Sequence, residues 1–438
     1  MSATDLVALV CCDLGAIVRG RSVFAAELDE HLAAGVGWVP ANHSITPLGT
    51  LAESTPFSSV GDLRLLPDID TRARVEAVPA EGAALDFVLC DIVETDGVPW
   101  RCCPRQFLRE ALEALASEFG ISLRSSFEHE FQLVEDAPAA APFSLEAQRR
   151  AEPFAGRLMA ALAQAGAQPE RFFPEFAPHQ FELPVAAAPA LAGADRSVVL
   201  KEVVRDLARH HGLWASFTPL LDPDQPGNGV HVHLNLLDVD GRPLLYDPQR
   251  PAQLSELGGR FAAGILRHAR ALSALTAPSP TSAARLVPHR WSVGAVCLAE
   301  RNREALLRIP PVVTLGGADP ASQLRLEYRG ADATANPYLA LGALVRAGLD
   351  GLRQELQPAP VLWDDPSHLD DADAARFGVG GLPDSLESSL QALEEDDAAR
   401  GWMAPLLYEA YVGVKRSEVD AARGSDLGEL CRRYAQIY

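Results

Sequence analysis

Lysine is nearly absent from this chain: Lys201 and Lys415 are the only two lysines among 438 residues. Arginine therefore carries almost all of the positive charge, so contacts with phosphate are expected to be guanidinium forks rather than ammonium contacts. Acidic residues outnumber basic ones, and the formal net charge is −21. This excess of negative charge argues against nucleic acid or an anionic membrane surface as the main partner.

Long apolar runs and paired cysteine motifs are also missing. No stretch approaches 18 uninterrupted apolar residues, and the N-terminus lacks a basic segment followed by an apolar run. The odd number of cysteines and the lack of a C-x-x-C motif argue against a disulfide framework or a thiolate zinc site. We therefore expect a soluble cytoplasmic protein. The seven cysteines are Cys11, Cys12, Cys90, Cys102, Cys103, Cys297 and Cys431.

The chain is long enough for two or three domains, and its composition changes at Pro104. Residues 1–103 are rich in Gly, Pro and Val and predict short strands and turns, with a hairpin at Asp96-Gly97. Residues 104–438 alternate between helical and strand patterns, which predicts a larger α+β domain with a mostly antiparallel sheet.

Helix signals within the larger domain are clear at several points. Pro104 and Gly120 suit the start and end of one helix, and Asn336-Pro337 suits an N-cap followed by proline at the first helical position. The Ala/Pro run at 137–142 and the Asp-rich stretch at 364–373 are expected to be loops. Further helices are expected over roughly 144–166, 195–211, 251–276, 337–350, 384–395 and 400–414.

Charged or imidazole side chains alternate with bulky apolar residues in four stretches. Alternate side chains of a β-strand point to opposite faces, so each stretch predicts one apolar face and one face of Glu, His, Gln or Arg. One such stretch is most often a solvated strand face. Four that use Glu, His and Arg indicate a surface able to hold metal ions and polyanions. The stretches are 127–131, 179–182, 230–234 and 324–329.

Five carboxylates and one imidazole on or near these strands predict a two-metal site. Mg²⁺ and Mn²⁺ prefer carboxylate oxygens, and Mn²⁺ tolerates imidazole better. This set would overcharge a single ion but fits two, and two-metal sites generally handle phosphoryl groups. The expected ligands are Glu128, Glu130, Glu175, Glu182, His231 and Glu327.

Arginines and a glycine turn complete the set of candidate groups. Arg303, Arg308, Arg325 and Arg329 could bind phosphate and carboxylate, or merely pair with glutamates across the sheet. The turn at 227–229 directly precedes the His231 strand and would let backbone N–H groups approach a ligand. By itself such a sequence is only a turn.

The order and spacing of these segments resemble the glutamine synthetase family along nearly the whole chain. Any one motif is weak, whereas seven in the family's order are specific. The matching stretches are 61–68, 128–131, 175–182, 227–233, 285–288, 302–310 and 325–339.

The resemblance implies an N-terminal β-grasp domain over 1–103 and a catalytic domain over 104–438, whose curved antiparallel sheet forms a funnel-like site. It also implies a ring-shaped homo-oligomer, hexamer or dodecamer, in which a neighbour's N-terminal domain completes each site. In the family's reaction ATP phosphorylates the γ-carboxylate of glutamate, and an amine then attacks the acyl phosphate.

The resemblance also implies roles for particular residues. Glu130, Glu175 and Glu182 match the first metal site, and Glu128, His231 and Glu327 match the second. His233, Arg303, Arg308 and Arg325 match ATP-phosphate contacts, while Gly227, Arg285 and Arg329 match groups that hold glutamate. The expected catalytic residues are Arg303, Glu327 and Trp291.

Two departures from the family pattern lie on the amine side. Trp291 stands where ammonia-using bacterial members carry a flap glutamate. Those members also use an N-terminal aspartate, whereas Glu53 is the only acid between His31 and Gly61 here. Carboxylates stabilise ammonium, and a tryptophan cannot replace their charge, although a cation–π contact is available to it. Tryptophan at this position favours an amine that carries carbon.

Smaller departures are Leu220 and Asn235 at nucleotide contacts and Pro226 at a glutamate contact. We therefore expect an ATP-dependent ligase that joins the γ-carboxylate of L-glutamate to an amine other than ammonia. A hydrophobic or aromatic monoamine is the first choice and a polyamine the second. The alternatives are a glutamine synthetase that uses ammonia and a non-catalytic, ring-forming homologue.

Overall fold

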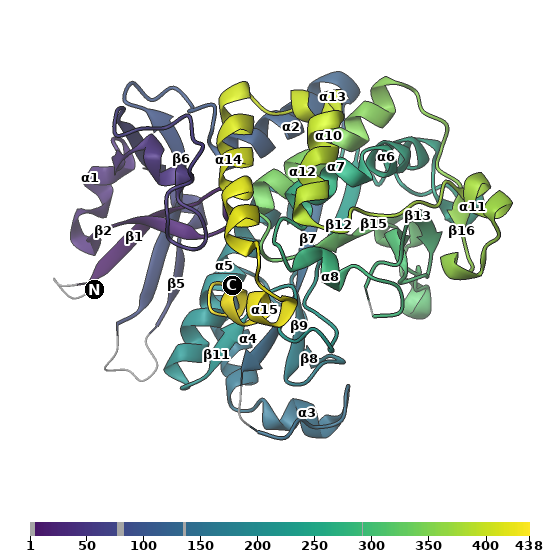
Figure 1. Ribbon diagram of the computed structural model, residues 1–438, viewed down its shortest axis with the longest axis horizontal. Coiled ribbons are helices and arrows are strands. Elements are labelled where there is room, and N and C mark those ends of the chain that lie inside the picture. Colours follow the sequence, from purple (N-terminus) through teal and green to yellow (C-terminus); the bar gives the residue numbers. More distant parts are fainter. Residues whose placement is uncertain (1–4, 77–82, 135–136, 291) are drawn as a thin grey trace.

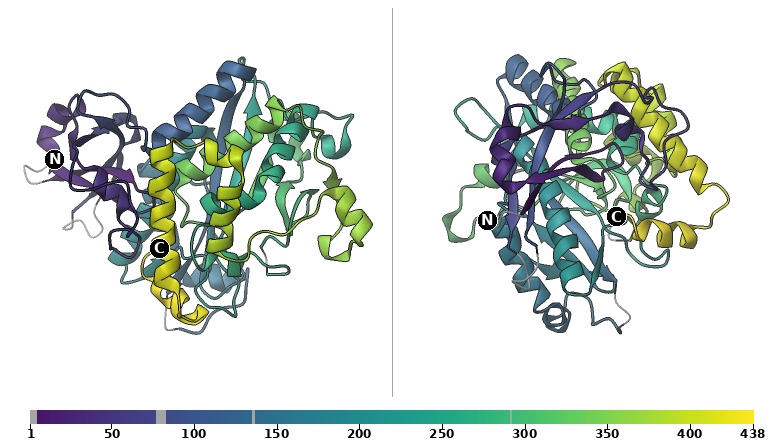
Figure 2. Two further views of the ribbon diagram at one scale, coloured as in Figure 1. Left: turned by 45° about the horizontal axis from the view of Figure 1, so that its top comes forward. Right: turned by 90° about the vertical axis from the view of Figure 1, so that its left-hand side faces the viewer.

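The computed structural model describes residues 5–76, 83–134, 137–290 and 292–438, and contains two β-sheets (Figure 1). The N-terminal sheet is six-stranded, with the order β2-β1-β6-β4-β3 and with β5 paired to β6. Its central strands β1 and β6 run parallel, and Figure 2 shows this domain to one side of the rest of the chain. The strands are β1 (Leu6–Cys12), β2 (Val18–Phe24), β3 (Val36–Trp38), β4 (Leu63–Pro67), β5 (Ala73–Val75) and β6 (Leu85–Glu94), with the helix α1 (Leu28–Leu32).

The second sheet has ten strands in the order β16-β13-β14-β15-β12-β7-β9-β8, with β10 and β11 also paired to β7. It is antiparallel except where β13 runs parallel to β14 and β16. The predicted α+β class with a mostly antiparallel sheet is confirmed. The strands are β7 (Ser122–Val134), β8 (Phe173–Pro174), β9 (Gln180–Pro184), β10 (Ala188–Pro189), β11 (Trp214–Ser216), β12 (Val230–Leu237), β13 (Ala295–Glu300), β14 (Ala305–Ile309), β15 (Leu326–Ala331) and β16 (Val361–Leu362).

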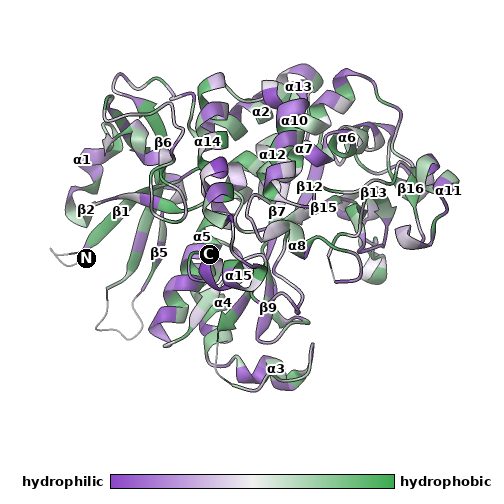
Figure 3. Cartoon of the chain, in the orientation of Figure 1, coloured by the Kyte–Doolittle hydropathy of each residue, from purple (hydrophilic) through white to green (hydrophobic). Residues whose placement is uncertain are grey.

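Helices α5 (Ala190–His210) and α10 (Pro337–Arg353) pack in the core beside this sheet, and α2 (Pro104–Phe119) packs on α10. The predicted start of α10 is confirmed, because the Asn336 side chain accepts hydrogen bonds from Tyr338 N and Leu339 N. Gly120 ends α2 in the left-handed conformation, also as expected. Figure 3 shows hydrophobic and hydrophilic residues alternating along the helices that surround the sheet.

Several helix predictions are wrong in their boundaries. The helix expected over 144–166 is two helices, α3 (Leu145–Arg150) and α4 (Phe154–Gln164), because Pro153 between them has no N–H to continue a helix. The helix expected over 251–276 is divided at His268 into α6 (Glu256–Arg267) and α7 (Ala269–Thr276). The imidazole of His268 lies there between the carboxylates of Asp350 and Asp396.

Other segments also differ from expectation. The loop predicted over 364–373 includes the start of α11 (Asp371–Phe377), because the Asp370 side chain caps that helix. The strand predicted from Leu324 begins at Leu326, since α9 (Pro320–Gln323) ends just before it. The remaining helices are α8 (Ser282–Arg285), α12 (Leu386–Glu395), α13 (Asp397–Gly401), α14 (Pro405–Ala422) and α15 (Leu427–Ala435).

A buried arginine joins the N-terminal domain to the larger domain. Arg105, at the start of α2, contacts Asp68 and Asp91 of the N-terminal domain at 2.7 and 3.1 Å. It also forms two hydrogen bonds with Asp195 of α5, both 3.0 Å long. Breaking such a buried ionic network is strongly destabilising, so it holds the N-terminal domain against the larger one.

All seven cysteines are buried and unpaired. Within the parts of the chain that the structure describes, no helix is both long and apolar enough to cross a membrane.

Candidate active site

Five neighbouring strands place the predicted polar residues side by side. Their cross-strand register puts these side chains on one face of the larger sheet, because directly opposed residues of paired strands point the same way. The alternating pattern was visible in the sequence, whereas the order of the strands was not. The opposed pairs, from β9 to β14, are Glu182–Glu130, Glu128–His231, His233–Glu327 and Glu327–Arg308.

This face borders a cavity of about 150 Å³. Ten of the predicted site residues line it, which brings carboxylates, one imidazole and three guanidinium groups together. His129, between two of the glutamates, points to the other face and lies 2.7 Å from Ser197 Oγ in the core. The ten residues are Glu128, Glu130, Glu175, Glu182, Gly227, His231, Arg303, Arg308, Glu327 and Arg329.

Glu327 is held between two arginines. Its side chain is almost fully buried and accepts hydrogen bonds from Arg308, at 2.7 Å, and from Arg329. Burial alone would raise the pKa of Glu327, but Arg329, His231, His233 and Arg308 outweigh it and lower the pKa to about 2. Glu327 is therefore ionised throughout the physiological range.

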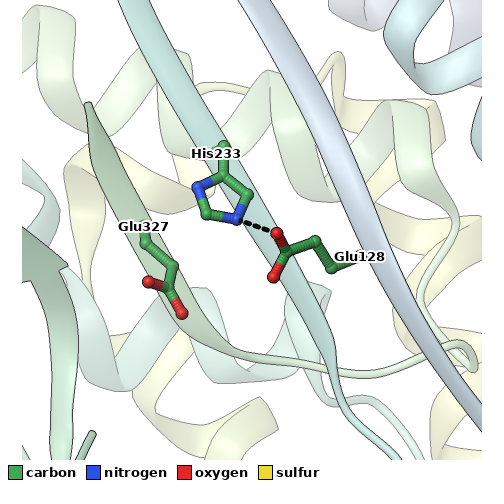
Figure 4. A group of neighbouring side chains, drawn as sticks. All are labelled: Glu128, His233 and Glu327. Atoms are coloured by element: carbon green, nitrogen blue, oxygen red, sulfur yellow. Dashed lines mark ion pairs between the residues drawn. The ribbon is translucent and has the colours of Figure 1, made fainter. Parts of the chain in front are cut away.

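The His233 side chain lies between an arginine and a glutamate and contacts both. Arg325 Nε donates a hydrogen bond to His233 Nδ1 at 3.0 Å, and the other ring nitrogen, Nε2, faces Glu128. That nitrogen is 2.9 Å from Glu128 Oε1, and Figure 4 shows the two side chains facing each other beside Glu327. Burial of Glu128 is outweighed by His233 and His231, which lower its pKa well below the usual range.

Glu175 and Glu182 have the opposite environment. Burial, followed by the charge of Glu130, raises the pKa of Glu175 to about 7. Burial and the charges of Glu128, Glu130 and Glu175 raise the pKa of Glu182 well above its usual range. These carboxyl groups face one another, and the positive charge around them does not balance their negative charge. Divalent cations that prefer oxygen ligands would supply the missing positive charge. The donor set therefore fits the metal ions expected here.

Two groups of three side chains have ligand atoms within 4.8 Å of one another: Glu128, His233 and Glu327, and Glu128, Glu182 and His231. This grouping differs from the expected division in two respects. Glu128 belongs to both groups, and His233, expected to contact ATP phosphates, stands among the candidate metal ligands. Arg325, also expected at the phosphates, contacts His233 and does not appear in the described cavity lining.

The glycine turn at 227–229 packs closely against its neighbours, and two of its N–H groups are not available to a ligand. A Cβ on Gly227 would lie 1.9 Å from the carbonyl oxygen of Pro219. The N–H groups of Asn228 and Gly229 are already used, donating to Pro219 O at 2.9 Å and to Glu130 at 2.7 Å. Arg285 is buried behind this turn, and its Nη2 donates to Ala331 O at 2.8 Å. Burial lowers the pKa of Arg285.

Three phenylalanines of the cavity lining were missed in the sequence: Phe143, Phe173 and Phe176. Phe143 and Phe176 lie outside the strands, and no periodic pattern distinguishes any of the three from ordinary core residues. Trp291, expected in the amine pocket, lies outside the described residues.

Comparison with known proteins identifies the chain's relatives. Residues 1–100 match the model of the glutamine synthetase N-terminal domain, and residues 101–426 match that of the glutamine synthetase catalytic domain. The chain belongs to the glutamine synthetase family. The predicted family, fold and enzyme class are confirmed, and the protein is an ATP-dependent ligase that forms a bond between the γ-carboxyl group of glutamate and nitrogen.

Individual members of the glutamine synthetase family show how the chain relates to this group. It is 35% identical over 442 residues to gamma-glutamylpolyamine synthetase GlnA3 of Streptomyces coelicolor, covering 99% of this chain and 93% of that protein. It is 32% identical to the glutamine synthetase of Thermotoga maritima, covering 80% of each chain. The crystal structure of a novel glutamine synthase homolog is 45% identical, with a TM-score of 0.92 over 100% of this chain and 99% of that one.

Divalent cations are expected to stabilise this family member more at pH 8 than at pH 6. A carboxyl group with a raised folded-state pKa favours folding at low pH, and this contribution is lost as the pH rises through that pKa, about 7 for Glu175. A cation must displace the proton from such a carboxyl group before it can bind. Below that pKa, each unit of increase in pH therefore makes the free energy of cation binding more favourable by up to ~1.4 kcal/mol for each proton released. Thermal unfolding with and without Mg²⁺ or Mn²⁺ at both pH values measures the difference.

The matched control is Glu175→Gln, which removes one titrating group and should reduce the pH dependence. An equal shift of Tm at both pH values in the unmodified protein would contradict the assignment of these carboxylates as metal ligands.

Proposed function

We propose that this protein joins the γ-carboxylate of L-glutamate to a primary amine other than ammonia. The observation that supports this most directly is the composition of the cavity, which combines carboxylates with an apolar wall that includes Phe143, Phe173 and Phe176. Ammonia has no carbon to place against such a wall. The replacement of the flap glutamate by Trp291, and the scarcity of acids between His31 and Gly61, support the same conclusion.

The chemistry would proceed in two displacements. A γ-carboxylate oxygen of glutamate attacks the γ-phosphorus of ATP and releases ADP. The amine nitrogen then attacks the acyl carbon of γ-glutamyl phosphate, releases phosphate and loses a proton. Arg303 is exposed at the cavity and Arg308 and Arg329 lie within it, so their guanidinium groups would neutralise charge on the transferring phosphoryl group.

We propose two bound divalent cations, Mg²⁺ or Mn²⁺, held by Glu128, Glu130, Glu175, Glu182, His231 and Glu327. When bound, they would offset the negative charge of the phosphate oxygens. The pairing of Glu327 with Arg308 and Arg329 would keep its carboxylate ionised and oriented toward the cavity. Gly227, Arg285 and Arg329 would hold glutamate, with Arg285 acting from behind the turn that it supports.

The test is phosphate release with ATP, L-glutamate, a divalent cation and a panel of amines that includes ammonia. Organic primary amines should give a higher kcat/KM than ammonia. The GlnA3 relative is named for polyamines, so diamines and polyamines belong in the panel. Ammonia with the highest kcat/KM of the panel would instead support a glutamine synthetase.

Trp291 is proposed to form part of the amine pocket. An indole wall stabilises apolar groups by roughly 25 cal/mol per Å² of contact, so one or two methylenes should change selectivity by about 10- to 200-fold. Trp291→Glu should move the preference toward ammonia or small cations, and Trp291→Ala should weaken discrimination by amine size. Relative kcat/KM values across the amine panel measure both effects. An unchanged ranking in Trp291→Ala would remove this residue from the pocket.

We further propose a ring of six subunits, single or stacked in pairs, in which the N-terminal domain over 1–103 completes the site of a neighbouring catalytic domain over 104–438. Sedimentation at micromolar protein concentration measures the assembly. A monomer of 46.9 kDa would contradict shared sites.

A further inference from the structure

Two phenylalanines from separate segments meet in the lining of the active-site cavity. Phe143 precedes α3 and Phe176 follows β8, and their ring centroids are 6.4 Å apart with planes at 60°. Both border the cavity beside Glu175. Phe143 is 50% exposed and Phe176 is 40% exposed, so both rings retain apolar surface that a ligand could cover.

The backbone holds both rings in place. Phe143 has a φ of 56°, in the left-handed region that non-glycine residues rarely adopt and that is concentrated at functional sites. Ser144, which follows it, caps α3 by accepting a hydrogen bond from Ala147 N at 3.0 Å. On the other side, Phe172 stacks on Phe181 in the core at 4.9 Å and anchors the segment that leads to Phe176.

A second cavity of about 50 Å³ adjoins the first and shares Glu175 and Gln180 with it. Its described lining consists mainly of alanine and proline side chains. Arg150 is the one arginine of that lining, and Glu175 is its one acid among the residues that the structure describes. Arg150 is anchored by an ion pair with Glu146 and by a 2.7 Å hydrogen bond to Pro138 O.

The mainly apolar lining of this second cavity would discriminate between amine tails. A methyl or methylene group would pack against small apolar side chains there and against the two rings. An ammonium group would instead lose hydration among these apolar side chains, and Glu175, the one acid of the described lining, is already proposed to bind metal. The surroundings therefore favour a tail without charge.

We propose that Phe143 and Phe176 bind the carbon skeleton of the amine substrate and that the alanine-lined cavity receives its distal end, which makes the substrate a primary monoamine with an apolar tail. This inference rests on the proposed ligase function and narrows its substrate class. The reacting nitrogen would lie on the carboxylate side of the cavity, with the tail directed past the two rings. Phe143, Phe176 and Arg150 are thus specificity residues and take no part in phosphoryl transfer.

The test compares kcat/KM for methylamine, propylamine, pentylamine and 1,4-diaminobutane, in which an ammonium replaces the terminal methyl of pentylamine. The kcat/KM of the unmodified enzyme should rise from methylamine to pentylamine. It should be at least about tenfold lower for the diamine than for pentylamine. Phe143→Ala and Phe176→Ala should each lower kcat/KM for pentylamine by roughly tenfold or more, and change that for methylamine little. Arg150→Glu should raise kcat/KM for the diamine relative to pentylamine.

The matched control is Phe119→Ala, since Phe119 at the end of α2 is 39% exposed and lines neither cavity. If organic amines are used but the phenylalanine variants keep the same ranking of amines, the inference is overturned while the ligase function stands. If ammonia exceeds every organic amine in the unmodified enzyme, the proposed function itself fails. The phenylalanine variants could instead lose kcat/KM equally with all amines and form smaller assemblies in sedimentation. That result would make Phe143 and Phe176 a contact between subunits and would also overturn the inference.

Discussion

Replacing Glu327 with glutamine is expected to lower kcat by roughly a thousandfold, the range seen when a charge-stabilising group is lost from a phosphoryl- or acyl-transfer site. The substitution retains the shape of the side chain and an oxygen acceptor for Arg308. It removes the negative charge of the carboxylate, which the two arginines keep ionised. It would weaken cation binding and reorient Arg308 and Arg329 together. Steady-state phosphate release, with circular dichroism to verify the fold, measures the effect.

The alanine variant separates chemistry from stability. Glu327→Ala would also leave two buried guanidinium groups without their carboxylate, which costs about 3–5 kcal/mol of stability when a buried pair is broken. We therefore expect Glu327→Ala to lose both activity and thermal stability, and Glu327→Gln mainly activity. The control is Glu118→Gln, at a partly exposed ion pair with Arg353. Near-normal turnover of Glu327→Ala would show that the second metal site is assigned wrongly.

Replacing Gly227 with alanine should lower kcat/KM by about 100-fold. The new Cβ would lie 1.9 Å from Pro219 O and 3.0 Å from Arg285 Cγ, so the turn must move. That movement would disturb the hydrogen bond from Gln180 to Gly227 O and displace the support of Arg285. A misplacement of about 1 Å in a reacting complex is enough to cost ~100-fold in rate.

The comparison is Gly401→Ala, because no atom of the described residues lies within 4 Å of a Cβ at that position. It should leave kinetics unchanged and should not lower Tm, because alanine is favoured over glycine in a helix such as α13. Wild-type kinetics in Gly227→Ala would mean that the turn adapts without affecting glutamate, and that its close packing has no role in binding.

The strands of the site could be predicted because alternation is a local property of sequence. Glu128 and Glu130 on β7, and His231 and His233 on β12, needed only a period of two to be placed on one face. Their pairing with Glu182 and Glu327 depends on the order of strands in the sheet, which alternation does not determine. The family resemblance assigned these residues to shared metal sites but implied no order of strands; the structure gives that order.

The remaining features depend on tertiary contacts. Phe143 and Phe176 lie in irregular segments, where no spacing indicates which way a ring points. The division of the helix at His268 coincides with its contacts to Asp350 and Asp396, which are distant in sequence. Likewise, the position of Arg285 behind the glycine turn follows from packing against Gly227 and Gly229, which its own motif does not reveal.

The central claim is that this member of the glutamine synthetase family uses an amine that carries carbon. The most direct measurement is a competition: ATP, L-glutamate, Mg²⁺ and equal concentrations of ammonium and pentylamine, with both products quantified by mass spectrometry. We predict that γ-glutamylpentylamide exceeds glutamine by at least about tenfold, as expected for an apolar pocket that discriminates by several methylenes. Glutamine as the main product would contradict the claim.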